Sequence, residues 1–91
     1  MIIGKWQGIS EGWEEVFIDF KEDGNYTNME GLIRGTWDLS ITKTENQNEY
    51  YIILHPNRKT DVKQATWKIN NIDESRLDIF DSFKDRNLIK K

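Results

Sequence analysis

The sequence predicts an all-β protein, a small antiparallel up-and-down barrel of about eight short strands. Apolar residues recur at every second position in several segments, most clearly at Val16, Ile18 and Phe20. This period is typical of a strand with one buried face. Turn-forming residues separate the segments. Apolar residues do not recur convincingly with helical spacing over three turns, and the segment 73–86 is the main place where a helical turn could lie.

The dipeptide Asp23-Gly24 predicts a β-hairpin. Glycine reaches positive φ without steric cost and aspartate tolerates it, so the pair favours a tight turn. An alternating segment, 13–21, enters the turn, and a weaker one, 25–29, leaves it. We therefore expect these two strands to pair, with Tyr26 opposite Phe20.

The remaining strands follow in order along the chain. They are predicted at 2–9, 32–42, 50–55, 62–70, 76–80 and 87–90. The apolar face of the longest one consists of Ile33, Gly35, Trp37, Leu39 and Ile41. A loop is predicted at 55–59 because proline, here Pro56, cannot donate a hydrogen bond to a neighbouring strand. A meander of this kind removes its two edges by closing into a barrel.

The length suits a single domain, residues 1–91. A chain this short has little stability to spare and needs large core side chains. It contains four Trp, four Phe and three Tyr. We expect the interior to be filled by Trp6, Phe20, Tyr26, Trp37 and Trp67. Aromatic rings occupy much of a small barrel, so little space would remain for a drug-sized cavity.

The formal net charge is −3, and the acidity is concentrated in residues 1–30, which contain two Lys and seven Asp or Glu. Contact with phosphate needs clustered Lys and Arg, so nucleic acid is not an expected partner. The absence of cysteine excludes disulfides and thiolate metal sites, and it fits a reducing compartment. We recognise neither a secretory signal nor an apolar run long enough to span a membrane, and we therefore expect a cytoplasmic protein without membrane contact.

No catalytic or metal-binding motif is recognised in the chain. A metal site built from several histidines is excluded because His55 is the only one. The C-terminal aspartates lack the spacing of a calcium loop. We therefore expect no catalytic residues, no metal and no cofactor, and we expect that the protein is not an enzyme. Two carboxylates converging on His55 would revive the enzyme hypothesis.

Several short motifs occur along most of the chain. They are Gly4-Lys5-Trp6, the Phe-x-x-Asp-Gly-x-Tyr hairpin from Phe20 to Tyr26, Gly35-Thr36-Trp37, and Trp67-Lys68-Ile69 followed by Leu77-Asp78-Ile79. In this combination the sequence resembles the bacterial lipocalin-like domains of the calycin group. The resemblance implies a lipocalin-like barrel that carries a small apolar ligand. Members of that group are usually longer and carry a secretion or lipoprotein signal, which is not recognised here.

Two binding hypotheses follow. The leading one is a non-enzymatic protein-binding module, and the composition suggests an inhibitor of a bacterial system of the anti-phage or CRISPR type. Apolar and acidic side chains on outward faces, which fit an interface with a charged rim, give the candidate protein-binding residues Glu15, Phe17, Asp19, Tyr51 and Phe80. The expected partner is a protein with a basic surface.

The alternative is a lipocalin-like carrier of a small apolar ligand. Its candidate ligand-binding residues are the inward aromatic residues Trp6, Phe20, Tyr26, Trp37 and Trp67. This alternative predicts an internal cavity of about 300 Å³ or more.

Overall fold

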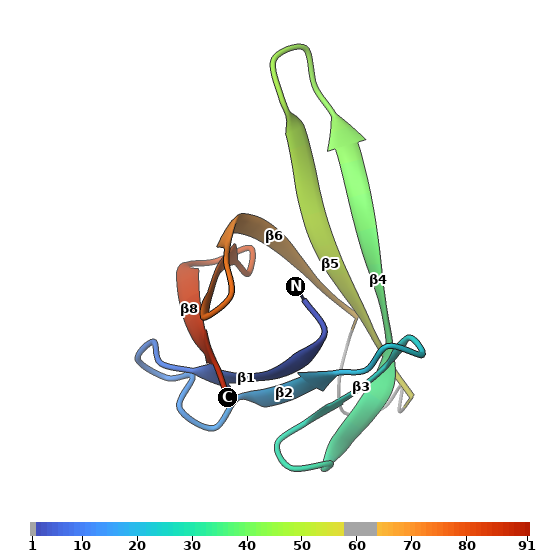
Figure 1. Ribbon diagram of the computed structural model, residues 1–91, viewed down its shortest axis with the longest axis vertical. Coiled ribbons are helices and arrows are strands. Elements are labelled where there is room, and N and C mark those ends of the chain that lie inside the picture. The colour runs from blue at the N-terminus through green and yellow to red at the C-terminus, as the bar shows by residue number, and fades with distance from the viewer. Residues whose placement is uncertain (1, 58–63) are drawn as a thin grey trace.

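The computed structural model describes residues 2–57 and 64–91, and these residues form a closed barrel of eight antiparallel strands (Figure 1). The strands are β1 (Gly4–Gly8), β2 (Phe17–Phe20), β3 (Asn25–Asn28), β4 (Ile33–Lys43), β5 (Asn48–Pro56), β6 (Ala65–Ile72), β7 (Arg76–Phe80) and β8 (Asp85–Lys90). Each strand pairs with the next one in the chain, and β8 closes the barrel on β1. The predicted fold class is thus confirmed.

The connections of an up-and-down barrel alternate between its two ends. The turns 21–24, 44–47 and 73–75 lie at one end, where β1 begins and β8 finishes. We call it the hairpin end. The connections 9–16, 29–32 and 81–84 lie at the opposite end, which we call the loop end.

The core is a single cluster of apolar side chains inside the barrel. Its buried members are Ile2, Trp6, Ile18, Phe20, Tyr26, Ile52, Leu54, Trp67, Leu77, Ile79 and Leu88. Strand alternation explains which residues are buried, since Ile18 and Phe20 face inward while Asp19 between them faces outward. The predicted pairing of Phe20 with Tyr26 is confirmed.

Two glycines are required by close approach of the backbone. A Cβ atom at Gly35 would lie 2.2 Å from the carbonyl oxygen of His55 in the adjacent strand. At Gly8 it would lie 2.2 Å from the carbonyl oxygen of Trp13. Gly8 thereby allows the connection 9–16 to lie directly against β1.

The predicted strand 13–21 is wrong in its first part, because β2 contains only Phe17–Phe20. Residues 9–16 form a connection closed by hydrogen bonds from Trp13 N to Ser10 O at 2.9 Å and from Val16 N to Trp13 O at 3.0 Å. Trp13 and Val16 nevertheless pack against the core. Because these loop side chains also reach the core, their spacing in the sequence resembled that of a strand and led to the wrong start of β2.

The predicted loop 55–59 is wrong for its first two residues, because β5 continues to Pro56, and residues 58 and 59 lie outside the described residues. Asn57 N donates to Arg34 O at 2.9 Å, so the next residue back, Pro56, directs its nitrogen away from β4. Proline can therefore stand in β5 without removing a hydrogen bond to β4.

Strand β6 differs from the predicted segment 62–70. Residues 62 and 63 lie outside the described residues, and the strand continues to Ile72. A β-bulge between Ile69 and Asn71 lets β6 follow β7 beyond the predicted end. The segment 73–86 contains no helical turn, since β7, a short turn and the start of β8 occupy it.

Candidate binding site at the hairpin end

Strands β4 and β5 extend beyond their neighbours. The β4–β5 register runs from Gly35–Pro56 to Lys43–Asn48. However, β3 pairs with β4 only as far as Thr36, and β6 pairs with β5 only as far as Tyr51. Among the described residues, 41–50 therefore form a two-stranded ribbon with no register partner on either side, whereas residues 38–40 lack a partner only on the β3 side. We call residues 38–50 the projecting hairpin (Figure 1).

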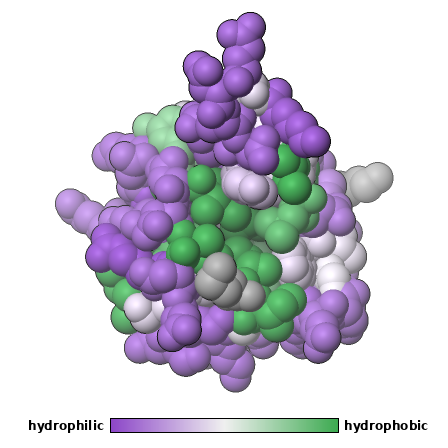
Figure 2. Space-filling model, turned by 45° about the horizontal axis from the view of Figure 1, so that its top comes forward, coloured by the Kyte–Doolittle hydropathy of each residue, from purple (hydrophilic) through white to green (hydrophobic). Residues whose placement is uncertain are grey.

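The inner face of the projecting hairpin is apolar as far as the Ile41–Tyr50 pair and largely uncovered, and the polar Lys43–Asn48 pair follows on the same face. Leu39, Ile41 and Tyr50 continue the row of inward side chains, and Ile41 lies directly opposite Tyr50. Their exposed fractions are 53%, 56% and 43%. The predicted apolar face of β4 is thus correct in phase, but its outer half is not buried, because the barrel does not reach that far. Apolar side chains gather at this end of the barrel in Figure 2.

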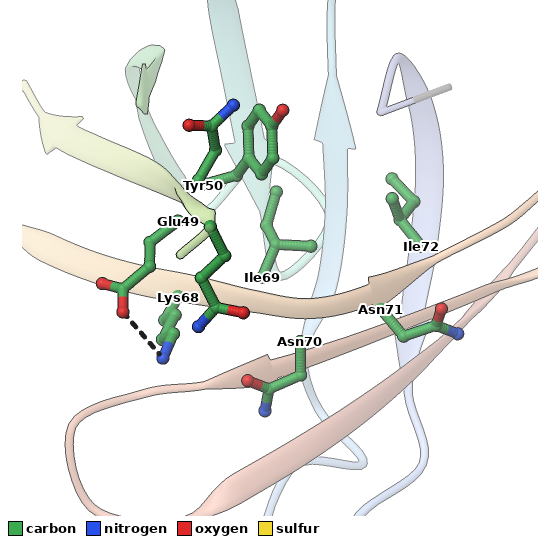
Figure 3. Close-up of a pocket in the computed structure, with 9 residues that line it drawn as sticks. Glu49, Tyr50, Lys68, Ile69, Asn70, Asn71 and Ile72 are labelled. Carbon is green, nitrogen blue, oxygen red and sulfur yellow. Dashed lines mark ion pairs between the residues drawn. The ribbon is translucent and has the colours of Figure 1, made fainter. Parts of the chain in front are cut away.

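Strands β5 and β6 separate at the base of this hairpin. Their register ends at the Tyr51–Lys68 pair, and the bulge in β6 follows immediately. A bulge bends its own strand, so β6 stays with β7 while β5 continues into the hairpin. The gap is an open hollow of about 380 Å³, which we call the β5–β6 cleft. It is lined by Gln47, Asn48, Glu49, Tyr50, Lys68, Ile69, Asn70, Asn71 and Ile72 (Figure 3).

The cleft combines an apolar side with a polar rim. Tyr50, Ile69 and Ile72 supply the apolar side chains, and Tyr50 and Ile69 point to the same side in Figure 3. Four amide side chains, from Gln47, Asn48, Asn70 and Asn71, supply hydrogen-bond donors and acceptors. Such a surface can take an apolar group together with a polar backbone.

An ion pair joins the two strands where their register ends. Lys68 Nζ lies 3.6 Å from Glu49 Oε1 (Figure 3). The Tyr51 hydroxyl donates to Glu49 Oε2 at 2.7 Å. The hydrogen bond from Tyr51, followed by the charge of Lys68, holds the pKa of Glu49 below its ordinary value. The carboxylate therefore stays ionised at neutral pH and marks the base of the cleft.

The five candidate protein-binding residues lie in two separate groups. Glu15, Phe17 and Asp19 belong to the connection 9–16 and to β2. Tyr51 and Phe80 flank Lys68 in one outward row across β5, β6 and β7. Strands β1 and β8 separate β2 from β7 on one side, and β3 and β4 separate β2 from β5 on the other. Phe17 is half-buried, whereas Phe80 is 38% exposed.

The five candidate ligand-binding residues belong to the interior. Trp6, Phe20, Tyr26 and Trp67 are buried in the core cluster. Trp37 is half-buried, packs edge-on against Phe20 at 5.3 Å and donates from Nε1 to Lys21 O at 3.0 Å. The β5–β6 cleft is lined by other residues.

Sequence reasoning missed the cleft and the uncovered half of β4. One signal was present, because the predicted strand 32–42 is much longer than its predicted neighbour 25–29. A long strand beside a short one must extend beyond it. No comparable signal indicated Asn70, since asparagine is not specific to a bulge.

The chemistry around His55 is limited. His55 Nε2 lies 3.0 Å from Asp38 Oδ2 across β4 and β5, and both side chains are exposed. In residues 2–57 and 64–91, no three His, Cys, Asp or Glu side chains are grouped closely enough to hold a metal ion. Over the same residues, no helix has the length and apolarity that a membrane span requires.

The chain matches no family model, and comparisons with curated proteins and with solved structures also give no match. The class defined by the fold is a closed, eight-stranded, antiparallel up-and-down barrel. This architecture is compatible with the lipocalin-like resemblance but does not identify that family. Membership of the calycin group therefore stays a prediction.

Proposed function

We propose that the protein is a non-enzymatic binding module that contacts another protein through the inner face of the projecting hairpin. The observation that supports this function is the exposure of Leu39, Ile41 and Tyr50 on the projecting hairpin, whose β4 edge has no described strand beside it beyond Thr36. A two-stranded hairpin is marginally stable in water, and exposed apolar groups that lie together commonly mark interaction sites. A partner that covers this face would stabilise the hairpin and remove its apolar side chains from water.

The proposed partner is a protein with a basic surface, and the proposed effect is inhibition of a bacterial system by blocking that partner. Glu45 at the hairpin tip and Glu74 at the neighbouring turn are both exposed, and they give this end acidic groups around the apolar face. An apolar centre with a charged rim is the usual anatomy of a protein interface. We propose the cytoplasm as its location because the chain lacks cysteine.

A pull-down with matched variants tests this function. The inner-face variant is Leu39→Ser with Ile41→Ser, and the control is Ser40→Ala with Thr42→Ala on the outer face of the same strand. We expect the wild type and the control to capture the same protein from a bacterial host lysate, as identified by mass spectrometry, and the inner-face variant to lose it. Thermal unfolding checks that all three proteins are folded. Capture by a folded inner-face variant at the wild-type level would refute the proposed surface.

A second candidate function is the carriage of a small apolar ligand. The volume of the β5–β6 cleft, about 380 Å³, supports it, because small-molecule sites begin at roughly 300 Å³. The test is titration with an apolar fluorescent dye. We expect stoichiometric binding that Ile69→Trp abolishes by filling the cleft, while Asn70→Gln on its rim has little effect. Equal dye binding by the wild type and Ile69→Trp would contradict a carrier function.

A further inference from the structure

The edge of β5 that borders the cleft has unpaired backbone groups. Backbone N–H and C=O groups point alternately to the two sides of a strand. At one end of β5, Asn57 N donates to Arg34 O, and at the other end Thr44 N donates to Gln47 O, each at 2.9 Å. Because the register between β4 and β5 is constant, the odd-numbered residues of β5 form their backbone hydrogen bonds with β4. The last β5–β6 pair, Tyr51–Lys68, places the Tyr50 C=O against the N–H of Ile69, so the groups that point into the cleft without a described strand partner are the N–H and C=O of Asn48 and the N–H of Tyr50.

The opposite wall of the cleft cannot satisfy these groups. The bulge between Ile69 and Asn71 keeps β6 on β7 and away from this part of β5. The unpaired edge and the apolar side chains of Tyr50, Ile69 and Ile72 therefore lie at the same hollow. An occupant that fits both features must offer backbone hydrogen bonds along one side and apolar groups on one face.

We propose that this occupant is an extended segment of the partner protein, which adds a strand to β5 by bonding to both backbone groups of Asn48 and to the N–H of Tyr50. This inference rests on the proposed function and specifies how the partner binds. Every second side chain of an added strand points to the same face, so apolar residues at alternate positions would lie against Ile69 and Ile72. The main chain supplies the attachment and the alternate side chains supply the selectivity, as in other cases of strand addition.

Charge indicates which segment fits. Two exposed acidic residues lie close in the chain to residues that line the cleft: Glu45 on the hairpin tip precedes Gln47, and Glu74 on the turn after β6 follows Ile72. Lys68 is already paired with Glu49, and the exposed Lys43 lies opposite Asn48. A segment that places Lys or Arg beside Glu45 or Glu74, and not beside Lys43, would be attracted to this rim. A second copy of the chain, whose formal net charge is −3, would bring the same acidic residues and be repelled.

The first test selects short linear peptides, displayed on phage, against the immobilised full-length protein. We expect the selected peptides to alternate apolar and polar residues and to contain Lys or Arg. N-methylation at one set of alternate backbone positions should weaken binding about tenfold or more, because it removes the donors that face β5. The same modification at the other set should have little effect. Peptides that tolerate both sets would overturn strand addition.

The second test measures amide hydrogen exchange by NMR with and without a selected peptide. We expect the amides of Asn48 and Tyr50 to exchange about tenfold more slowly in the complex. The amides of Glu49 and Tyr51, which point to β4, are the internal control and should not change. Protection of Leu39 and Ile41 amides instead would overturn the placement, because these amides belong to the other edge of the hairpin.

The outcomes separate this inference from the proposed function. If Leu39→Ser with Ile41→Ser abolishes partner capture but bound peptide leaves Asn48 and Tyr50 unprotected, strand addition fails and the hairpin interface stands. If the folded inner-face variant retains its partner, the proposed function itself fails. Light scattering that shows a dimer dependent on the same hairpin would also overturn the inference, because the occupant would then be a second copy.

Discussion

The two ends of the barrel differ in how their apolar side chains are covered. At the loop end, Trp13 packs against Trp67 with ring centroids 5.3 Å apart, and the Arg86 guanidinium lies 5.1 Å above the Trp13 ring. At the hairpin end, Leu39 and Ile41 face the same interior but remain more than half exposed. The connection 9–16 is long enough to fold back over its end, whereas 44–47 is a tight turn that carries its strands outward.

This difference teaches that an inward direction is not the same as burial. Strand alternation decides the direction of a side chain, but a second element must cover it. The loop end also has exposed apolar residues, notably Leu32 and Phe83, but each lies on its own turn. Single exposed residues are ordinary on a protein surface, whereas those of the projecting hairpin lie side by side.

The largest expected effect is at the loop end. Trp67→Ala should lower the free energy of unfolding by about 3–5 kcal/mol, because it empties the space beneath Trp13. The measurement is urea unfolding followed by circular dichroism. Thr66→Ala, an exposed neighbour in the same strand, should change the value by no more than about 0.5 kcal/mol. A loss below about 1 kcal/mol for Trp67→Ala would mean that the loop end is not closed as described.

A smaller loss is expected for Gly8→Ala. The added methyl group would meet the Trp13 carbonyl oxygen, so the connection 9–16 must move away from β1. We expect a cost of about 1–3 kcal/mol, typical of overpacking, and a change in tryptophan fluorescence. Glu14→Ala, on the exposed surface of the same connection, is the control. If Gly8→Ala were neutral, the close approach of the two backbones would be contradicted.

Acid should weaken the turn 81–84 at the loop end. Burial raises the pKa of Asp81, but hydrogen bonds from the backbone N–H groups of Lys84 and Phe83 and from Arg86 outweigh it. The folded pKa therefore lies below the ordinary value of 3.8. Ionised Asp81 therefore stabilises the folded protein. This stabilisation is fully present above the pKa of the unfolded state and is lost as pH falls through the pKa of the folded state.

The variant Asp81→Asn measures that contribution. It keeps an oxygen for the turn but removes the charge that faces Arg86, so we expect a loss of about 1 kcal/mol at pH 7. The variant should also depend less on pH below about 4 than the wild type. Urea unfolding from pH 2 to 7 provides the comparison. Parallel curves for the two proteins would show that Asp81 contributes nothing to acid sensitivity.

The smallest expected effect on stability is at the projecting hairpin. Leu39→Ser with Ile41→Ser should change the free energy of unfolding by less than about 1 kcal/mol, because both side chains are already exposed. Thermal unfolding of this variant and of Ile18→Ser, which alters a buried side chain, gives the contrast. A loss above about 2 kcal/mol at the hairpin would mean that the inner face is packed and not free to bind.

The sequence carried most of the fold. Alternation at Ile18 and Phe20 predicted both the strand and its buried face, and Asp23-Gly24 predicted the hairpin that pairs Phe20 with Tyr26. The residues at which strands begin and end were harder to predict. The apolar spacing of Trp13 looks like that of a strand residue, although the residue reaches the core from a connection.

The candidate site could be predicted only in part. The phase of Leu39 and Ile41 was correct, but their exposure depends on where β3 stops and on the bulge in β6. Both are properties of the neighbouring strands, so inspection of β4 alone cannot reveal them. The outward candidates Phe17 and Phe80 were assigned by phase in the same way, and the barrel places them on strands that do not adjoin.

The pairing of β1 with β8 has a practical consequence for handling the protein. Trp6 lies opposite Lys90, so both termini emerge at the end that carries the projecting hairpin. An affinity tag fused to either terminus would crowd the surface under test. The natural chain has no cysteine, so Lys84→Cys in the turn 81–84 would create a unique thiol for attachment to a sensor chip. Immobilised through that thiol, the molecule would present its hairpin outward to solution.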